Sequence, residues 1–248
     1  MIRIKRVQRL LPIINPIMGV LILALFSGCI QVEQTLTLNP DGSGVVDLSY
    51  ALSEDQAASL HALATELYEQ DGEDHSSVFD ASDEEIRKEF KEYEVHGVVL
   101  QSVQTGQAGG RKQRRLVISF QSLEGLARSG FLSDRQVSLV RNAQGDYVFT
   151  QAGTAGNSDE LLMANEMAED PMAAEMMQGF RVTLRIRTPS RILNTNAPEK
   201  TDRVATWRFD LDRDPKAVER VANLKTQVSF EGKGLNIREF RSVRAATP

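Results

Sequence analysis

Arginine side chains alternate with apolar ones along one short segment, and this is the clearest binding pattern in the sequence. Residues 180–187 place Arg181, Arg185 and Arg187 between apolar residues, and Arg208 lies in a second alternating segment, residues 205–211. Because successive side chains of a strand point to opposite faces, these arginines are expected on the exposed face of two neighbouring strands. Such a patch could bind anionic lipid headgroups or an anionic envelope polymer. A solvated face on which the arginines pair with acidic residues is the simpler alternative.

Methionines form the second pattern. All five methionines that follow residue 28 lie within residues 161–178, and they are Met163, Met167, Met172, Met176 and Met177. Thioethers spaced by four residues share a helix face, which could make an adaptable groove for a partner or, least favoured, hold Cu(I). Packing of this face against a sheet is the simplest explanation. A Met-rich helical lid over residues 153–178 is the alternative.

No residues have the spacing of a catalytic or metal-binding motif. His61, His75 and His96 lie far apart, and no Gly-x-Ser-x-Gly segment occurs. Residues 39–44 and 210–214 have the alternate spacing of a calcium loop but lack its remaining ligands or its glycine, so the first is better explained as a tight turn. The sequence therefore predicts no catalytic residue, no metal and no cofactor.

Residues 1–28 have the layout of a secretory signal. Four basic residues and no acidic one precede an apolar stretch, and the only cysteine, Cys29, directly follows Gly28. The apolar core, residues 17–26, is about half as long as the roughly 20 residues of a spanning helix. Residues 25–29 resemble the cleavage motif of bacterial lipoproteins, which implies cleavage between Gly28 and Cys29, lipidation of Cys29 by acyl chains such as palmitate, and membrane attachment.

The residue after the cysteine bears on location. In lipoproteins of bacteria with two membranes, an Asp at that position typically retains the protein in the inner membrane, whereas this chain has Ile30. The resemblance therefore implies the periplasmic face of the outer membrane in such a host. In a host with one membrane it implies the cell exterior.

Charge and cysteine content restrict the partners and the source of stability. Removing the four basic residues of segment 1–28 from the total of 29 leaves 25 basic against 34 acidic residues, a net charge near −9. An acidic chain binds nucleic acid poorly, so no nucleic-acid partner is expected. With its only cysteine assigned to lipid, the exported chain has no disulfide, and its stability must come from a hydrophobic core.

Hairpins and short amphipathic helices are expected to carry these residues. Strands are predicted at residues 32–38, 45–52, 95–103, 116–120, 137–141, 146–150, 180–186, 205–211 and 226–230. Helices are predicted at residues 53–69, 82–93, 122–129 and 214–223. This order predicts an α+β fold, an antiparallel sheet built from hairpins with inserted amphipathic helices, and a single domain over residues 29–248.

Three short segments resemble the LppM-type lipoprotein domain family of bacteria. They are the Asn-Pro-Asp-Gly-Ser-Gly turn at residues 39–44, the Thr-Pro-Ser-Arg-Ile-Leu-Asn-Thr-Asn segment at residues 188–196, and the Thr206-Trp207 pair. The resemblance implies a surface-exposed lipoprotein of poorly defined biochemistry, and it transfers no catalytic residue.

Two functional hypotheses follow. The leading one is a non-enzymatic lipoprotein that binds or assembles another envelope component, a protein or an anionic polymer, through the arginines or the Met-rich segment. The alternative is a hydrolase-like enzyme that acts on the envelope, with a cleft beneath residues 161–178.

Overall fold

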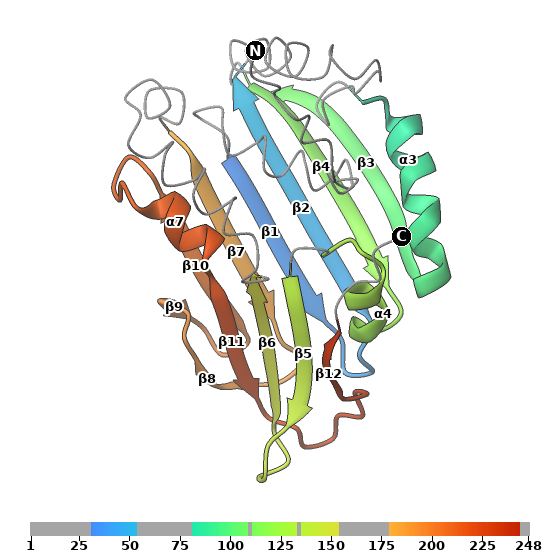
Figure 1. Cartoon of the computed structure of the whole chain (residues 1–248), viewed down its shortest axis with the longest axis vertical. Helices are drawn as coiled ribbons and strands as arrows, with labels where there is room; N and C mark the ends of the chain where they lie inside the picture. Colours follow the sequence, from blue (N-terminus) through green and yellow to red (C-terminus); the bar gives the residue numbers. More distant parts are fainter. Residues whose placement is uncertain (1–30, 54–80, 109–110, 133–134, 154–178, 244–248) are drawn as a thin grey trace, which may run out of the picture.

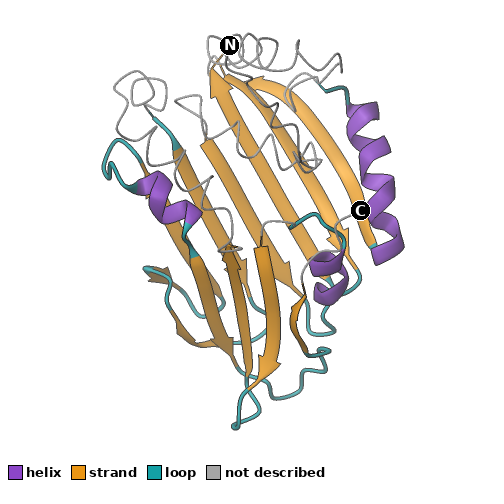
Figure 2. Cartoon of the chain, in the orientation of Figure 1, coloured by secondary structure: helices purple, strands orange, loops and turns teal. Residues whose placement is uncertain are grey.

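Two β-sheets with short helices at their margins make up the part of the chain that the computed structural model describes, residues 31–53, 81–108, 111–132, 135–153 and 179–243 (Figures 1 and 2). The seven-stranded sheet has the order β3-β4-β2-β1-β7-β10-β9, and the five-stranded sheet has the order β12-β5-β6-β11-β8. Buried residues of both sheets belong to one hydrophobic core. The inner face of each sheet is therefore the face that carries its buried apolar side chains.

The first predicted hairpin is confirmed. Strands β1 (Gln31–Leu38) and β2 (Gly44–Ser53) pair antiparallel around a turn. In that turn the Asp41 carboxylate accepts hydrogen bonds from the Ser43 backbone N–H at 3.0 Å and from the Ser43 hydroxyl at 2.7 Å. Residues 39–44 thus form a tight turn stabilised by the aspartate side chain, as sequence reasoning favoured.

The second capping box is also confirmed, but the strand after it begins later than predicted. Ser82 caps helix α3 (Asp83–Phe90), which continues into the 3₁₀ helix η1 (Lys91–His96). Gly97 then ends η1 with a left-handed φ of 72°, and strand β3 (Val98–Ala108) starts only after it. The predicted strand 95–103 is therefore wrong at Val95 and His96, because a glycine that readily adopts positive φ terminates a helix there.

Strand β4 (Arg111–Phe120) pairs with both β3 and β2. It is followed by the predicted short helix α4 (Leu123–Arg128), whose first turn is capped by the Ser122 hydroxyl. The pairing of β3 with β4 contains an irregularity between Leu100 and Ser102. Beyond it, β3 and β4 run together to the short connection at residues 109–110.

The five-stranded sheet contains the second predicted hairpin, β5 (Arg135–Arg141) and β6 (Tyr147–Gly153), and the predicted strand β11 (Lys225–Phe230). Two short edge strands, β8 (Ile192–Thr195) and β12 (Phe240–Val243), complete it, and the sequence did not predict either of them. The fully buried Tyr147 holds the segment before β12. Its hydroxyl accepts from the Ile237 N–H at 2.8 Å and donates to the Ile237 carbonyl at 2.8 Å.

Strands β7 (Arg181–Arg187) and β10 (Val204–Asp210) pair antiparallel, as their alternation predicts. The two-residue strand β9 (Glu199–Lys200) forms the edge beside β10, and helix α7 (Ala217–Ala222) follows. One feature corrects the predicted antiparallel sheet, because β7 pairs with β1 in parallel. The fold is α+β and mostly β, with mixed pairing in the larger sheet and only antiparallel pairing in the smaller one.

Several predicted elements lie outside the described residues. These are the N-terminal segment with Cys29, most of the helix predicted over residues 53–69, and residues 154–178 of the predicted lid. Among the helices that the structure does describe, none is long and apolar enough to cross a membrane.

Candidate functional site

The arginine face is the candidate site, and we define it as Arg181, Arg185 and Arg187 of β7 together with Arg208 of β10. Val182 and Ile186, which alternate with them, are buried in the core, so the arginines point to the outer face of the seven-stranded sheet. The register places Arg208 opposite Thr183, between Arg181 and Arg185. Sequence alternation therefore placed all four side chains on one face correctly.

Carboxylates neutralise most of this face. Arg185 forms an ion pair with Glu33 of the neighbouring β1 at 2.8 Å. Arg181 lies 3.2 Å from the Asp210 carboxylate and 3.4 Å from that of Asp212. These acidic residues come from segments far apart in sequence, so their approach follows from the pairing of β7 with β1 and β10.

Arg187 differs from the other three arginines of the face. Arg208 pairs with Glu199 of β9, whereas no ion pair or hydrogen bond of the Arg187 side chain occurs among the described residues. Arg187 is exposed, at the end of β7 opposite Val204. Exposed ion pairs contribute about 0–1 kcal/mol each, so an anionic ligand could displace the carboxylates, but Arg187 is the one arginine of this face that needs no such exchange.

The same outer face continues across β1, β2 and β4 as a polar surface. Arg115 of β4 donates from Nε to the Asp47 carboxylate of β2 at 2.8 Å, and this contact lowers the pKa of Asp47. Thr35 lies between Asp47 and Arg185 in register. Matched charges therefore cover the face, and its binding specificity would depend on how a ligand's charges align with this pattern.

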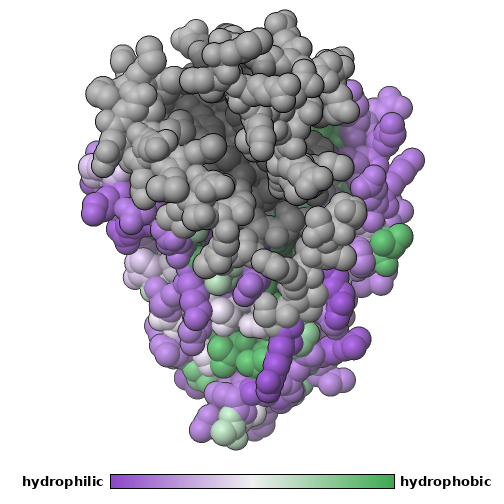
Figure 3. Space-filling model, in the orientation of Figure 1, coloured by the Kyte–Doolittle hydropathy of each residue, from purple (hydrophilic) through white to green (hydrophobic). Residues whose placement is uncertain are grey.

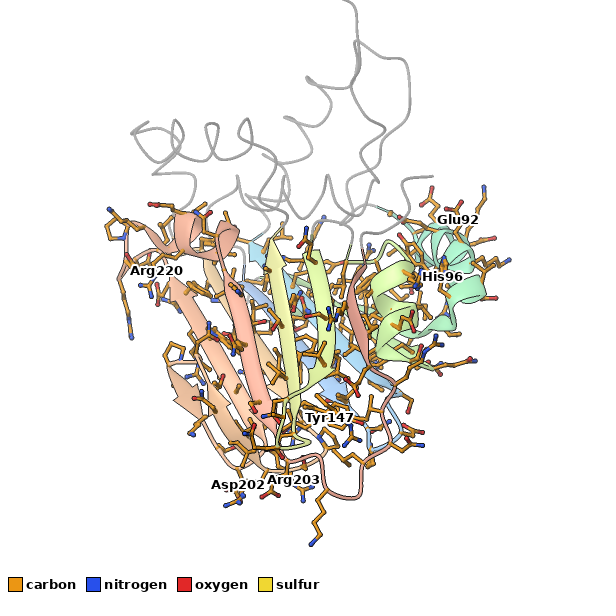
Figure 4. The ribbon with its side chains drawn as sticks, turned by 60° about the horizontal axis from the view of Figure 1, so that its bottom comes forward. Glu92, His96, Tyr147, Asp202, Arg203 and Arg220 are labelled. Atoms are coloured by element: carbon orange, nitrogen blue, oxygen red, sulfur yellow. The ribbon has the colours of Figure 1, made fainter. Side chains whose placement is uncertain are left out.

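The two ends of the arginine face differ in their distance from the predicted anchor. Arg181 is the register partner of Gln31, the first residue of β1, which follows Cys29 by two residues. Two extended residues span at most about 7 Å, so a lipid on Cys29, which stays a prediction, would be attached near the Arg181 end. Arg187 lies at the other end of β7, where the next residue, Thr188, donates its backbone N–H to the Arg203 carbonyl at 2.9 Å. Figure 4 shows Arg203 on the opposite side of the molecule from Arg220 of α7.

The remaining candidates give no second site. Cys29 and Gly28 lie outside the described residues, as do Met163, Met167, Met172 and Met176 with the cleft proposed beneath them. Within the described ranges, no group of three or more His, Cys, Asp or Glu side chains could hold a metal ion. Asp210 and Asp212 instead pair with Arg181, and Asp214 pairs with Arg220 at 2.7 Å.

A buried polar cluster beneath α3 was not predicted. Arg114 of β4 is only 5% exposed and points inward, where its Nε donates to Thr105 at 3.0 Å and an Nη donates to the Ala81 carbonyl at 2.7 Å. Arg114 also interacts with the Tyr50 hydroxyl, whose pKa is raised to about 12 because burial outweighs the charge of Arg114. Arg114 lies two and four residues before the buried Leu116 and Ile118, so all three point to the same face of the strand. This spacing was the signal that could have placed Arg114 inside.

Glu89 of α3 belongs to the same cluster. Its carboxyl is partly buried, and its Oε1 has no hydrogen-bond partner among the described residues. Burial, with a smaller contribution from the charge of Glu92, raises the pKa of Glu89 to about 7.

A search of solved structures finds the folded domain of LppM from Mycobacterium tuberculosis, determined by NMR, with 11% sequence identity and a TM-score of 0.44. The similarity covers 83% of this chain and 91% of that one. No family model matches the chain, and a search of curated proteins also finds no match. The comparisons assign no role to any residue of this chain.

Proposed function

We propose that the protein is a lipid-anchored envelope lipoprotein that works as a non-enzymatic binding or assembly module. The observation that carries this proposal is the basic, apolar and Gly28-Cys29 sequence of the N-terminus, followed within two residues by strand β1. Lipid on Cys29 would hold the large sheet next to its membrane with almost no linker. In a host with two membranes, Ile30 favours the periplasmic face of the outer membrane.

The first experiment tests the anchor. Cells that express the full chain or its Cys29→Ser variant are labelled with a fatty-acid analogue, and membranes are separated from soluble fractions. The proposal expects label on the wild-type chain only, and loss of cleavage at Gly28 in the variant. Label retained by Cys29→Ser would refute the lipoprotein assignment.

Binding by the arginine face is the finer part of the proposal, and its ligand is an anionic envelope component. Support comes from the four arginines that share one outer face and from Arg187, which has no carboxylate partner in the described part of the chain. An anionic ligand would engage Arg187 first and then compete with Glu33 and Glu199 for Arg185 and Arg208. Such binding should weaken as salt concentration rises.

The second experiment tests this face. The tagged full chain is extracted from membranes, and the envelope components that copurify are compared for wild type, Arg187→Ser and the triple variant Arg181→Ser, Arg185→Ser and Arg187→Ser. Arg115→Ser is the matched control, because Arg115 lies on the same outer face but outside the arginine face. Equal recovery from all four proteins would exclude the arginine face as the binding surface.

A further inference from the structure

The four edges of the two sheets are not alike. Three of them end in short strands, namely the two-residue β9, and β8 and β12 of four residues each with an irregular register. Short and irregular edge strands prevent unwanted pairing with other chains. The fourth edge, β3, has eleven residues, and a single irregularity in its pairing with β4 lies between Leu100 and Ser102.

Strand β3 also lacks the side chains that usually protect an edge. Its sequence, Val-Val-Leu-Gln-Ser-Val-Gln-Thr-Gly-Gln-Ala, contains no charge and no proline. Within the described ranges β3 pairs only with β4, and its residues Gln101, Gln104, Thr105 and Gly106 are exposed. Every second residue of such a strand directs its N–H and C=O away from the sheet, where they can pair with another strand.

The charges beside β3 suit a second copy of the same chain. Helix α3 lies alongside β3 (Figures 1 and 2), and it carries Asp83, Glu84 and Glu85 in its first turn and Arg87 and Lys88 in its last. Asp83 accepts a hydrogen bond from Thr105 at 3.3 Å, so the acidic end of α3 lies near the C-terminal half of β3. If two such edges met antiparallel, the acidic end of each helix would lie beside the basic end of the other.

An exposed apolar side chain lies at the same edge. Val95 of η1 is 82% exposed, the largest exposure of any large hydrophobic residue in the described ranges. The described surface that is visible in Figure 3 is mostly hydrophilic, with an apolar patch in its lower middle. A single exposed valine is not a binding site by itself, but a second copy at this edge would give it a place to be covered.

We propose that two copies of the chain associate through β3, antiparallel about a two-fold axis near the middle of the strand, to form one continuous sheet. The uncharged eleven-residue edge supplies the backbone hydrogen bonds, and the acidic first turn and basic last turn of α3 favour a second copy over an unrelated strand. This association does not depend on the arginine face, which lies on the outer surface of β7 and β10.

Cysteine cross-linking in membranes tests the proposal on the full chain. Each residue from 101 to 106 is replaced by Cys in turn, and membranes are oxidised before electrophoresis without reductant. A disulfide needs a Cα–Cα distance of about 4.4–6.8 Å, and one step along the strand separates the symmetric pair by about a further 6.6 Å. The proposal therefore expects a dimer band at one position, or at two adjacent ones, that exceeds the background at least fivefold.

Two controls set the background. The wild-type chain reports any cross-linking through its own Cys29, and Ser138→Cys reports random collision through β5, which pairs with β6 and β12 and is not an edge strand. If no position exceeds these controls, or if all six cross-link equally, β3 does not pair with a second copy. The experiment uses six positions because, if one cysteine variant fails to accumulate in membranes, the variants at adjacent positions can still be measured.

A charge on the edge supplies an independent check. In the best cross-linking variant, a lysine at the exposed Gln104, or at Gln101 if position 104 carries the cysteine, should reduce the dimer band at least threefold, because the two-fold axis brings the two lysines close together. Gln136→Lys on β5 is the matched control and should leave the band unchanged. Equal bands from both lysine variants would overturn the proposed pairing.

Discussion

Replacing Glu89 by glutamine should stabilise the protein, and the gain should appear only as the pH rises. In the folded chain the pKa of Glu89 is raised from 4.5 to about 7, first because the carboxyl is buried and second because of the charge on Glu92. The folded state therefore holds a proton on Glu89 between pH 4.5 and 7 that the unfolded chain has released. Stability from this group is fully present below pH 4.5 and falls as the pH rises towards 7.

The size of the effect follows from that interval. Moving the pKa from 4.5 to about 7 would correspond to at most about 3–4 kcal/mol, and solvent around the partly exposed carboxyl reduces this to about 1–2 kcal/mol. Glutamine has nearly the same shape and never ionises. The difference in free energy of unfolding between Glu89→Gln and wild type should thus be about 1–2 kcal/mol larger at pH 8 than at pH 4.5, in favour of the variant.

Urea denaturation at pH 4.5, 5.5, 6.5 and 8 measures this difference. Glu94→Gln is the control, because Glu94 is an exposed glutamate of the adjacent η1. The difference between variant and wild type should grow between pH 4.5 and 7 and then stay level. A difference independent of pH, or one that shrinks as the pH rises, would show that the buried carboxyl does not carry a proton in the folded state.

Three further substitutions test the packing. Tyr147→Phe should lower the free energy of unfolding by about 2–4 kcal/mol in urea titrations, because it leaves the N–H and C=O of the buried Ile237 without their partner; a loss under 0.5 kcal/mol would contradict this. Ser82→Ala should lower the free energy of unfolding by about 1 kcal/mol because it removes the capping box of α3, and an unchanged value in urea titrations would contradict this. Gly44→Ala should prevent accumulation of folded protein in the soluble or membrane fraction, because its Cβ would lie 2.1 Å from the Thr37 carbonyl oxygen and 2.3 Å from the Phe120 ring; normal yield and normal circular dichroism would refute this packing.

Local patterns in the sequence predicted most elements but not their assembly. Alternation placed β7 and β10 side by side with Trp207 inside and Arg208 outside, and the capping box at Ser82 located α3. The parallel pairing of β1 with β7 has no local signature, because the two strands lie about 150 residues apart and each would alternate in the same way beside any neighbour. Strands β8, β9 and β12 are too short to show a period.

The candidate site was predicted in part for the same reason. Strand periodicity gave the side on which Arg181, Arg185 and Arg187 lie, but it contained no information on the acidic residues that meet them. Glu33 approaches Arg185 only because β1 and β7 pair. The predicted start of the strand at Val95 was wrong because the prediction gave more weight to the apolar residues than to Gly97. In the structure, Gly97 adopts a left-handed conformation that ends η1 before the strand begins.

The position of β1 determines how the domain would bear a mechanical load. Strand β1 is the central strand of the seven-stranded sheet and is bonded to β2 on one side and β7 on the other. A pull on Cys29, two residues before its first residue, would act along the strand and would strain both hydrogen-bond ladders together in shear. An edge strand pulled sideways opens one bond at a time, so a domain that is pulled through its central strand resists unfolding by force better than one pulled through an edge strand.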